Sequence, residues 1–121
     1  MMMDWNGYLK DLLGTIGKFA ELSPDTVRGY GIISQAGQKT NHLDGKTREL
    51  IALAVAVTTR CDGCITVHTD AAIKAGATKE EIAEALGVAI DLNAGAALVY
   101  SARVLDAYAA KTGTQAEAAR R

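Results

Sequence analysis

Two cysteines and a histidine stand together in the segment Cys61-Asp62-Gly63-Cys64-Ile65-Thr66-Val67-His68. Because residues three or four apart share a face of a helix, Cys61, Cys64 and His68 are expected on one side of a helix that begins near Cys61. Unpaired N–H groups and the helix dipole at that end favour the thiolate, which is the nucleophilic form of cysteine. The CxxC spacing also lets the two sulfurs close a disulfide after one has been oxidised. These residues indicate thiol redox chemistry.

Two further features can assist the thiols. His68 follows Cys64 by one helical turn, so a neutral imidazole there can accept the Cys64 proton or relay it. Glu49 stands at the head of an otherwise apolar segment, and a carboxylate bordering a core needs a partner or takes a raised pKa. Either condition suits a proton relay with His68. A purely structural interpretation stays open for each group. The cysteines can be inert, the histidine can be a structural residue, and the glutamate can be a helix-start residue favoured by the helix dipole.

The same residues can also be interpreted as a metal site. Cys61, Cys64 and His68 offer three ligands of the kind that Zn²⁺ prefers. Structural zinc sites usually have a second ligand pair, which this sequence lacks, so we expect no bound metal. A glycine-rich phosphate loop after a strand is also missing, so we expect no nicotinamide or flavin cofactor. Electrons for a redox reaction must then come from a partner.

Composition and charge restrict the class of protein. The 121 residues are 49% hydrophobic and 22% charged, which predicts one globular domain over residues 1–121. A net charge of −1 without a basic stripe argues against nucleic-acid binding. The longest apolar run, residues 50–57, is too short for a membrane span, and residues 1–10 do not resemble a signal peptide. We therefore expect a soluble cytoplasmic protein. In the reducing cytoplasm a CxxC pair serves redox or metal chemistry and not as a permanent structural disulfide.

The spacing of apolar residues is helical, without sustained strand-like alternation, and predicts an all-α fold. Six helices are expected, over residues 4–20, 23–35, 44–59 (or 47–59), 61–75, 78–90 and 93–110. Ser23 before Pro24 predicts one helix start, and the capping-box pattern from Thr78 to Glu81 predicts another. Residues 50–57 are apolar nearly all round, which is typical of a central helix. Residues 111–121 are expected to be a frayed tail.

Residues 86–98 are unusually apolar and rich in glycine and alanine. Small residues let helix backbones approach closely, and a compact monomer of this size cannot easily cover so much apolar surface. We therefore expect a homo-oligomer in which a second subunit covers the remaining face.

The pattern of Glu49, then Cys61-x-x-Cys64 and His68, followed by Ala75-Gly76-Ala77-Thr78-Lys79-Glu80-Glu81-Ile82, resembles the alkylhydroperoxidase AhpD and carboxymuconolactone decarboxylase superfamily. The resemblance covers residues 44–108. It implies an all-α fold of about six helices that assembles into trimers or hexamers. In the AhpD-type members the second cysteine attacks a hydroperoxide and the first resolves the product, while a glutamate and the later histidine form a proton relay.

Carried over to this chain, the resemblance makes Cys64 the peroxidatic thiol, Cys61 the resolving thiol, and Glu49 with His68 the relay. The predicted activity is an antioxidant, thiol-dependent hydroperoxide reductase. Its oxidised dithiol would be reduced by an external dithiol on a lipoyl-bearing or thioredoxin-like protein.

One position departs from the pattern, because AhpD has a histidine immediately before the second cysteine and this chain has Gly63. Activation of Cys61 could therefore differ. The decarboxylases of the superfamily lack the CxxC pair, which argues against lactone decarboxylation. Three alternatives stay open: a disulfide reductase or relay for another protein that uses the same dithiol, a zinc-binding protein, and a family member of other activity.

Overall fold

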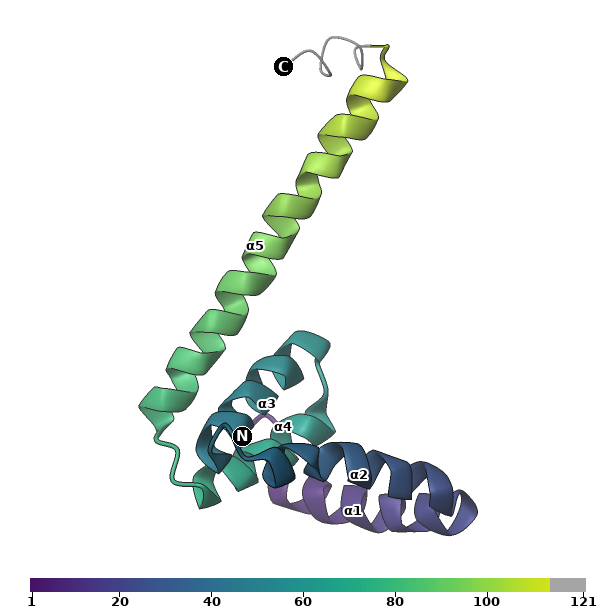
Figure 1. Ribbon diagram of the computed structural model, residues 1–121, viewed down its shortest axis with the longest axis vertical. Coiled ribbons are helices and arrows are strands. Elements are labelled where there is room, and N and C mark those ends of the chain that lie inside the picture. The colour runs from purple at the N-terminus through teal and green to yellow at the C-terminus, as the bar shows by residue number, and fades with distance from the viewer. Residues whose placement is uncertain (114–121) are drawn as a thin grey trace.

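The computed structural model describes residues 1–113, and these residues form five α-helices without a strand. The helices are α1 (Trp5–Leu22), α2 (Pro24–Thr40), α3 (Gly45–Thr59), α4 (Asp62–Lys74) and α5 (Lys79–Lys111). Helices α1 and α2 lie side by side as a hairpin, and α1 also contacts α4 (Figure 1). Helix α3 packs against α4 and against the beginning of α5, whose far end projects away from the other four helices. The predicted all-α class is confirmed.

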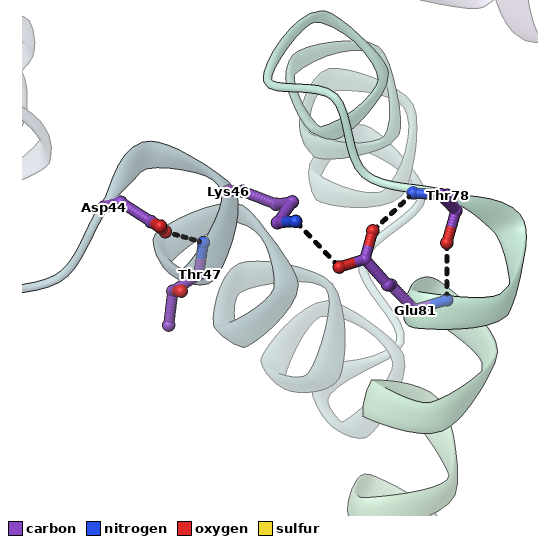
Figure 2. Close-up of polar contacts among 5 residues, drawn as sticks. All are labelled: Asp44, Lys46, Thr47, Thr78 and Glu81. Carbon is purple, nitrogen blue, oxygen red and sulfur yellow. Dashed lines mark hydrogen bonds and ion pairs between the residues drawn. The ribbon is translucent and has the colours of Figure 1, made fainter.

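Most helix boundaries follow from capping residues that are visible in the sequence. The Asp44 side chain accepts a hydrogen bond from the Thr47 N–H at 2.8 Å and begins α3, as Figure 2 shows. Pro24 occupies the first turn of α2, as expected from its fixed φ angle. The capping box at the start of α5 is also confirmed, because Thr78 accepts from the Glu81 N–H and Glu81 accepts from the Thr78 N–H.

The two last predicted helices are in fact one helix of 33 residues, so the predicted break between residues 90 and 93 is wrong. The segment contains no proline. Asn93, at which the last helix is predicted to begin, donates from its side-chain amide to Ala89 O one turn back at 2.7 Å and to Thr58 Oγ1 of α3 at 2.9 Å. These bonds satisfy the amide inside a continuous helix, so nothing ends the helix there.

Helix α2 continues to Thr40, beyond the predicted end at residue 35. Its last turn is held by Arg48 of α3, whose guanidinium donates to Gly37 O at 3.3 Å, to Asn41 Oδ1 at 3.2 Å and to Leu43 O. A positively charged side chain is favourable beside the carbonyl end of a helix. A side chain at Gly37 would collide with Arg48, since a Cβ there would lie 2.9 Å from Arg48 Cδ.

An ion pair joins the beginnings of α3 and α5. Lys46 Nζ lies 2.8 Å from Glu81 Oε2, while the other oxygen of the same carboxylate accepts from the Thr78 N–H (Figure 2). The Glu81 hydrogen bond raises the pKa of Lys46, and the Lys46 hydrogen bond lowers the pKa of Glu81. Both side chains are more than a third exposed, so the pair orients the two helices more than it stabilises them.

Within residues 1–113 the buried apolar side chains are few and mostly small. They are Leu53 and Ala56 of α3, Ala72 of α4 and Ala89 of α5. Contrary to the expectation of a central helix, α3 leaves Ile51, Val55 and Val57 exposed. On α5 the exposed large apolar side chains are Val88, Ile90, Leu92, Leu98, Val99, Tyr100, Val104, Leu105 and Tyr108. We refer to this set as the α5 apolar surface.

Length and composition would also allow α5, alone among the helices of residues 1–113, to cross a membrane, with a mean hydropathy of 1.6 in its most apolar window. Core helices of soluble proteins meet the same criterion. The predicted tail begins at Lys111, which still belongs to α5, and residues 114–121 lie outside the described residues.

The capping box gives the first testable prediction. Replacing the N-cap side chain in Thr78→Ala removes the acceptor for the Glu81 N–H and should lower the free energy of unfolding by about 1 kcal/mol. The measurement is urea denaturation at one fixed protein concentration. The control is Thr15→Ala, at an exposed position in the interior of α1. Equal unfolding midpoints for Thr78→Ala and wild type would contradict the stabilising role of the cap.

Candidate active site

The chain reverses direction between α3 and α4 within two residues. Arg60 takes the left-handed conformation with φ 56°, and its N–H donates to Ala56 O at the end of α3. The next N–H, of Cys61, donates to the same carbonyl oxygen at 3.1 Å. Cys61 is then the N-cap of α4, and its Sγ accepts a hydrogen bond from the Cys64 N–H at 3.2 Å. This turn places the first cysteine at a helix N-terminus, as the sequence predicted.

The two thiols are unequal. Both cysteines are free and half-buried. The pKa of Cys61 is lowered, first by the hydrogen bond from the Cys64 thiol and then by the N–H groups of Cys64 and Gly63. The pKa of Cys64 is raised, because its thiol donates to Cys61 and because burial and the nearby negative charge of Cys61 disfavour a second thiolate. Cys61 therefore ionises first, and Cys64 keeps its proton to a higher pH.

A histidine of α4 contacts a carboxylate of α3. His68 Nδ1 lies 2.7 Å from Glu49 Oε2, which α3 supplies. The pair is about a quarter exposed, with side-chain exposures of 30% for His68 and 24% for Glu49. A carboxylate at Nδ1 holds the proton on that nitrogen and leaves Nε2 as the acceptor, with no partner within residues 1–113. The structure thus brings together the two residues that the sequence predicted as a relay, one turn after Cys64.

Helix α1 covers the first turn of α4 from the other side. The Thr66 hydroxyl, which is buried, donates to Trp5 O at 3.2 Å. Leu12 lies against Gly63, because a Cβ at position 63 would be 2.9 Å from Leu12 Cδ2 and 3.9 Å from the Tyr8 hydroxyl oxygen. Any side chain at position 63 would require Leu12 to move. This packing gives a physical reason for glycine within the CxxC motif.

Sequence reasoning did not associate Tyr8 and Leu12 with the cysteines. The available signal was their helical spacing with Trp5, which indicates one face of α1 but not the helix that this face contacts. In the structure these three side chains are half-buried, whereas their neighbours Asn6 and Asp11 are exposed.

The zinc alternative gains no support from the geometry. Within residues 1–113, no three side chains of histidine, cysteine, aspartate or glutamate converge as a group that could hold a metal ion. Although Cys61 and Cys64 are adjacent, the Nδ1 of His68 is turned to Glu49. What the arrangement can do is provide a thiolate, a second thiol and an oriented imidazole.

Comparison with known proteins identifies the family. The model of the carboxymuconolactone decarboxylase family matches residues 24–107. An uncharacterized protein from Haemophilus influenzae is 47% identical over 108 residues, which cover 89% of this chain and 96% of that protein. An uncharacterized protein from Cupriavidus necator is 29% identical over 105 residues, with coverages of 87% and 93%.

A solved structure agrees with this assignment. The crystal structure of a carboxymuconolactone decarboxylase family protein from Legionella pneumophila, in its apo form, has a TM-score of 0.69 and 36% identity to this chain. The match covers 92% of this chain and 96% of the Legionella protein. The resemblance inferred from Glu49, the CxxC motif and His68 is confirmed at the level of the superfamily. The chain belongs to the carboxymuconolactone decarboxylase family.

Proposed function

We propose that this protein is a thiol-dependent hydroperoxide reductase that uses Cys61 and Cys64 in a dithiol–disulfide cycle. The observation that carries the proposal is the 2.7 Å contact between Glu49 and His68, one helical turn from Cys64. The Glu49 contact fixes the orientation of an imidazole that lies one helical turn after Cys64, and the pKa of the Cys64 thiol is raised. A base is the group that such a thiol requires to become a nucleophile.

The proposed cycle begins when His68 Nε2 accepts the Cys64 proton. The Cys64 thiolate attacks the terminal peroxide oxygen, the O–O bond breaks, and the alkoxide that leaves takes up a proton to become an alcohol. The terminal oxygen stays on sulfur as a sulfenic acid. The Cys61 thiolate then attacks that sulfur, and the hydroxide that leaves is protonated to water. The lowered pKa of Cys61 suits this second step, because the attacking form is the thiolate.

Each turnover leaves a disulfide between Cys61 and Cys64, which an external dithiol must reduce while becoming a disulfide itself. We propose a lipoyl-bearing or thioredoxin-like protein as this reductant. The cycle suits a cytoplasmic protein, because a reducing compartment returns the pair to its thiol form.

A second function is favoured by the position of Cys61. A thiol of lowered pKa at the first position of a CxxC motif is the group that attacks disulfides. A protein disulfide reductase or relay would therefore use Cys61 to attack and Cys64 to resolve, which reverses the order of the peroxidase cycle. The two functions are separated by which cysteine each reaction needs first.

We also propose that the chain works as a homo-oligomer, a trimer or a hexamer. The α5 apolar surface continues into a groove between α3 and α5, lined by Val55, Val88 and Leu92 among other residues. Nine large side chains left in water on one helix are unfavourable, and burial against further copies removes this cost. The hydrogen-bonded Asn93 and Thr58 lie in the same groove.

The peroxidase cycle predicts different defects for the two cysteines. With an alkyl hydroperoxide and excess dithiol, Cys64→Ser should lose turnover, because no nucleophile remains at the relay. Without added dithiol, which would itself reduce the sulfenic acid, Cys61→Ser should reduce one equivalent of hydroperoxide per chain and then stop as a sulfenic acid, which dimedone traps and mass spectrometry detects. Wild-type turnover by Cys64→Ser would refute the cycle. Faster wild-type turnover of a disulfide than of any hydroperoxide, together with loss in Cys61→Ser, would favour the disulfide reductase.

The relay is tested in the same assay. Glu49→Gln should lower the rate of peroxide reduction by about 100-fold, in the range expected for general base catalysis. The matched control is Glu84→Gln, an exposed residue of α5 remote from the cysteines in sequence. Equal rates for the two glutamine variants would exclude Glu49 from the relay.

The unequal thiols predict a pH-dependent order of modification. Because the pKa of Cys61 is below and that of Cys64 above the ordinary thiol value, iodoacetamide should alkylate Cys61 first near neutral pH. The rate should fall as the pH drops through the Cys61 pKa. Trypsin cleavage after Arg60 and Lys74 releases residues 61–74, and fragmentation of that peptide locates the label. Prior alkylation of Cys64 would contradict the order of ionisation.

The assembly predicts a solution mass of three or six times the 12.7 kDa chain mass by analytical ultracentrifugation. Val99→Asp places a charge on the α5 apolar surface and should shift the protein to smaller species, since Val99 is 74% exposed in one chain and needed only between chains. Asn6→Asp, on the exposed side of α1, should keep the wild-type mass. A monomer in solution, or a protein recovered only with membranes, would contradict the proposal.

A further inference from the structure

One polar group at the dithiol remains without a role in the proposed cycle. The Tyr8 hydroxyl lies 3.9 Å from the position that a Cβ would take at Gly63, the residue directly before Cys64. Helix α1 is held there by the hydrogen bond from Thr66 to Trp5 O and by the contact of Leu12 with Gly63. Tyr8 thus lies in the sequence of α1 between two residues, Trp5 and Leu12, that both contact α4.

The Tyr8 hydroxyl has no hydrogen-bond partner within residues 1–113, although the side chain is half-buried. Because none of the described side-chain oxygens that lack a partner is sealed from solvent, the Tyr8 hydroxyl is open to water and to a dissolved molecule, toward which it can act as donor or acceptor. Here the neighbouring N–H group of Gly63 is directed to the Cys61 sulfur. The hydroxyl is therefore a donor that faces the reactive turn and is available to a bound molecule.

We propose that Tyr8 is a catalytic residue of this site, whose hydroxyl donates a proton to the oxygen that leaves the hydroperoxide. This inference rests on the proposed peroxidase function. The bond that forms joins the Cys64 sulfur to the terminal oxygen, and the bond that breaks is O–O. Its electron pair departs with the alkyl-bearing oxygen, which takes the Tyr8 proton and becomes an alcohol. The phenolate then regains a proton from water.

In this proposal His68 and Tyr8, which lie after and before Cys64 around the site, have different functions in proton transfer. His68 lies one turn further along α4 and, with Nδ1 held by Glu49, offers an acceptor for the thiol proton. Tyr8 reaches the preceding residue from α1 and offers a donor for the developing alkoxide. A base on one side and an acid on the other match the two proton transfers that peroxide reduction needs.

The test compares leaving groups that do and do not need a proton. Tyr8→Phe keeps the ring that packs on α4 and removes only the hydroxyl. Its second-order rate constant with tert-butyl hydroperoxide should fall about 100-fold, as expected for loss of a general acid. Its rate with peracetic acid, and the alkylation of its thiols by iodoacetamide, should stay within about twofold of wild type, because carboxylate and iodide leave without a proton. The control Tyr30→Phe, at an exposed position of α2, should keep the wild-type rates with all three reagents.

Three outcomes would overturn the inference. Equal losses with all three reagents would make Tyr8 a structural residue, and no loss with tert-butyl hydroperoxide would leave it without a part in the reaction. In both cases an active wild type keeps the proposed function intact. A wild type that consumes no alkyl hydroperoxide would overturn the inference and the peroxidase proposal together.

Discussion

The two backbone hydrogen bonds accepted by Ala56 O, from the N–H groups of Arg60 and Cys61, are the constraint on which the site depends. They require Arg60 to adopt a left-handed conformation, and the chain therefore reverses at once from α3 into α4. A tight reversal sets the two helices against each other, so that a carboxylate near the start of α3 meets a histidine on α4. The same turn leaves Cys61 outside the helix, where its sulfur can accept the Cys64 N–H. The Glu49–His68 contact and the unequal ionisation of the thiols thus share one backbone origin.

The small buried core has a related origin. Three of its four apolar members are alanines, which allow α3, α4 and α5 to approach closely but bury little area each. Most of the large aliphatic side chains of α3 and α5 remain outside this contact. A single chain therefore positions Glu49, His68 and the two cysteines with polar bonds and caps, and in the proposed oligomer the larger hydrophobic contribution to stability would come from contacts between chains.

The sequence was sufficient to predict features that depend on residues within one helical turn, such as helix starts. Pro24 and the Thr78–Glu81 box each act within one turn of their own position, so the starts of α2 and α5 were predicted, whereas the start of α3 was left open between residues 44 and 47. The spacing of the cysteines and His68 likewise lies within one helix. The pairing of Glu49 with His68 crosses between helices, but the burial cost of a carboxylate signalled that it needed a partner.

The errors arose where a distant residue decides the local structure. A separate last helix was predicted from residue 93, yet the Asn93 amide donates to Ala89 and to Thr58, 35 residues away, within a continuous α5. The end of α2 was predicted too early because its last turn is held by Arg48, which belongs to the next helix. Arg48 lies 11 residues after Gly37, the residue whose carbonyl oxygen it binds. The approach of Leu12 to Gly63 joins residues 51 positions apart, and periodicity shows which face of α1 is apolar but not where it rests.

The bond from Thr66 to Trp5 O has a consequence for how such proteins can diversify. Its acceptor is a backbone carbonyl, so it holds α1 against α4 whatever side chains the following two turns carry. The covering helix can therefore exchange the groups that it presents to Gly63 while the cysteines, His68 and Glu49 stay unchanged. Two relatives with identical motif residues can then differ in the molecules they accept, and the difference would be found in the first dozen residues of the chain.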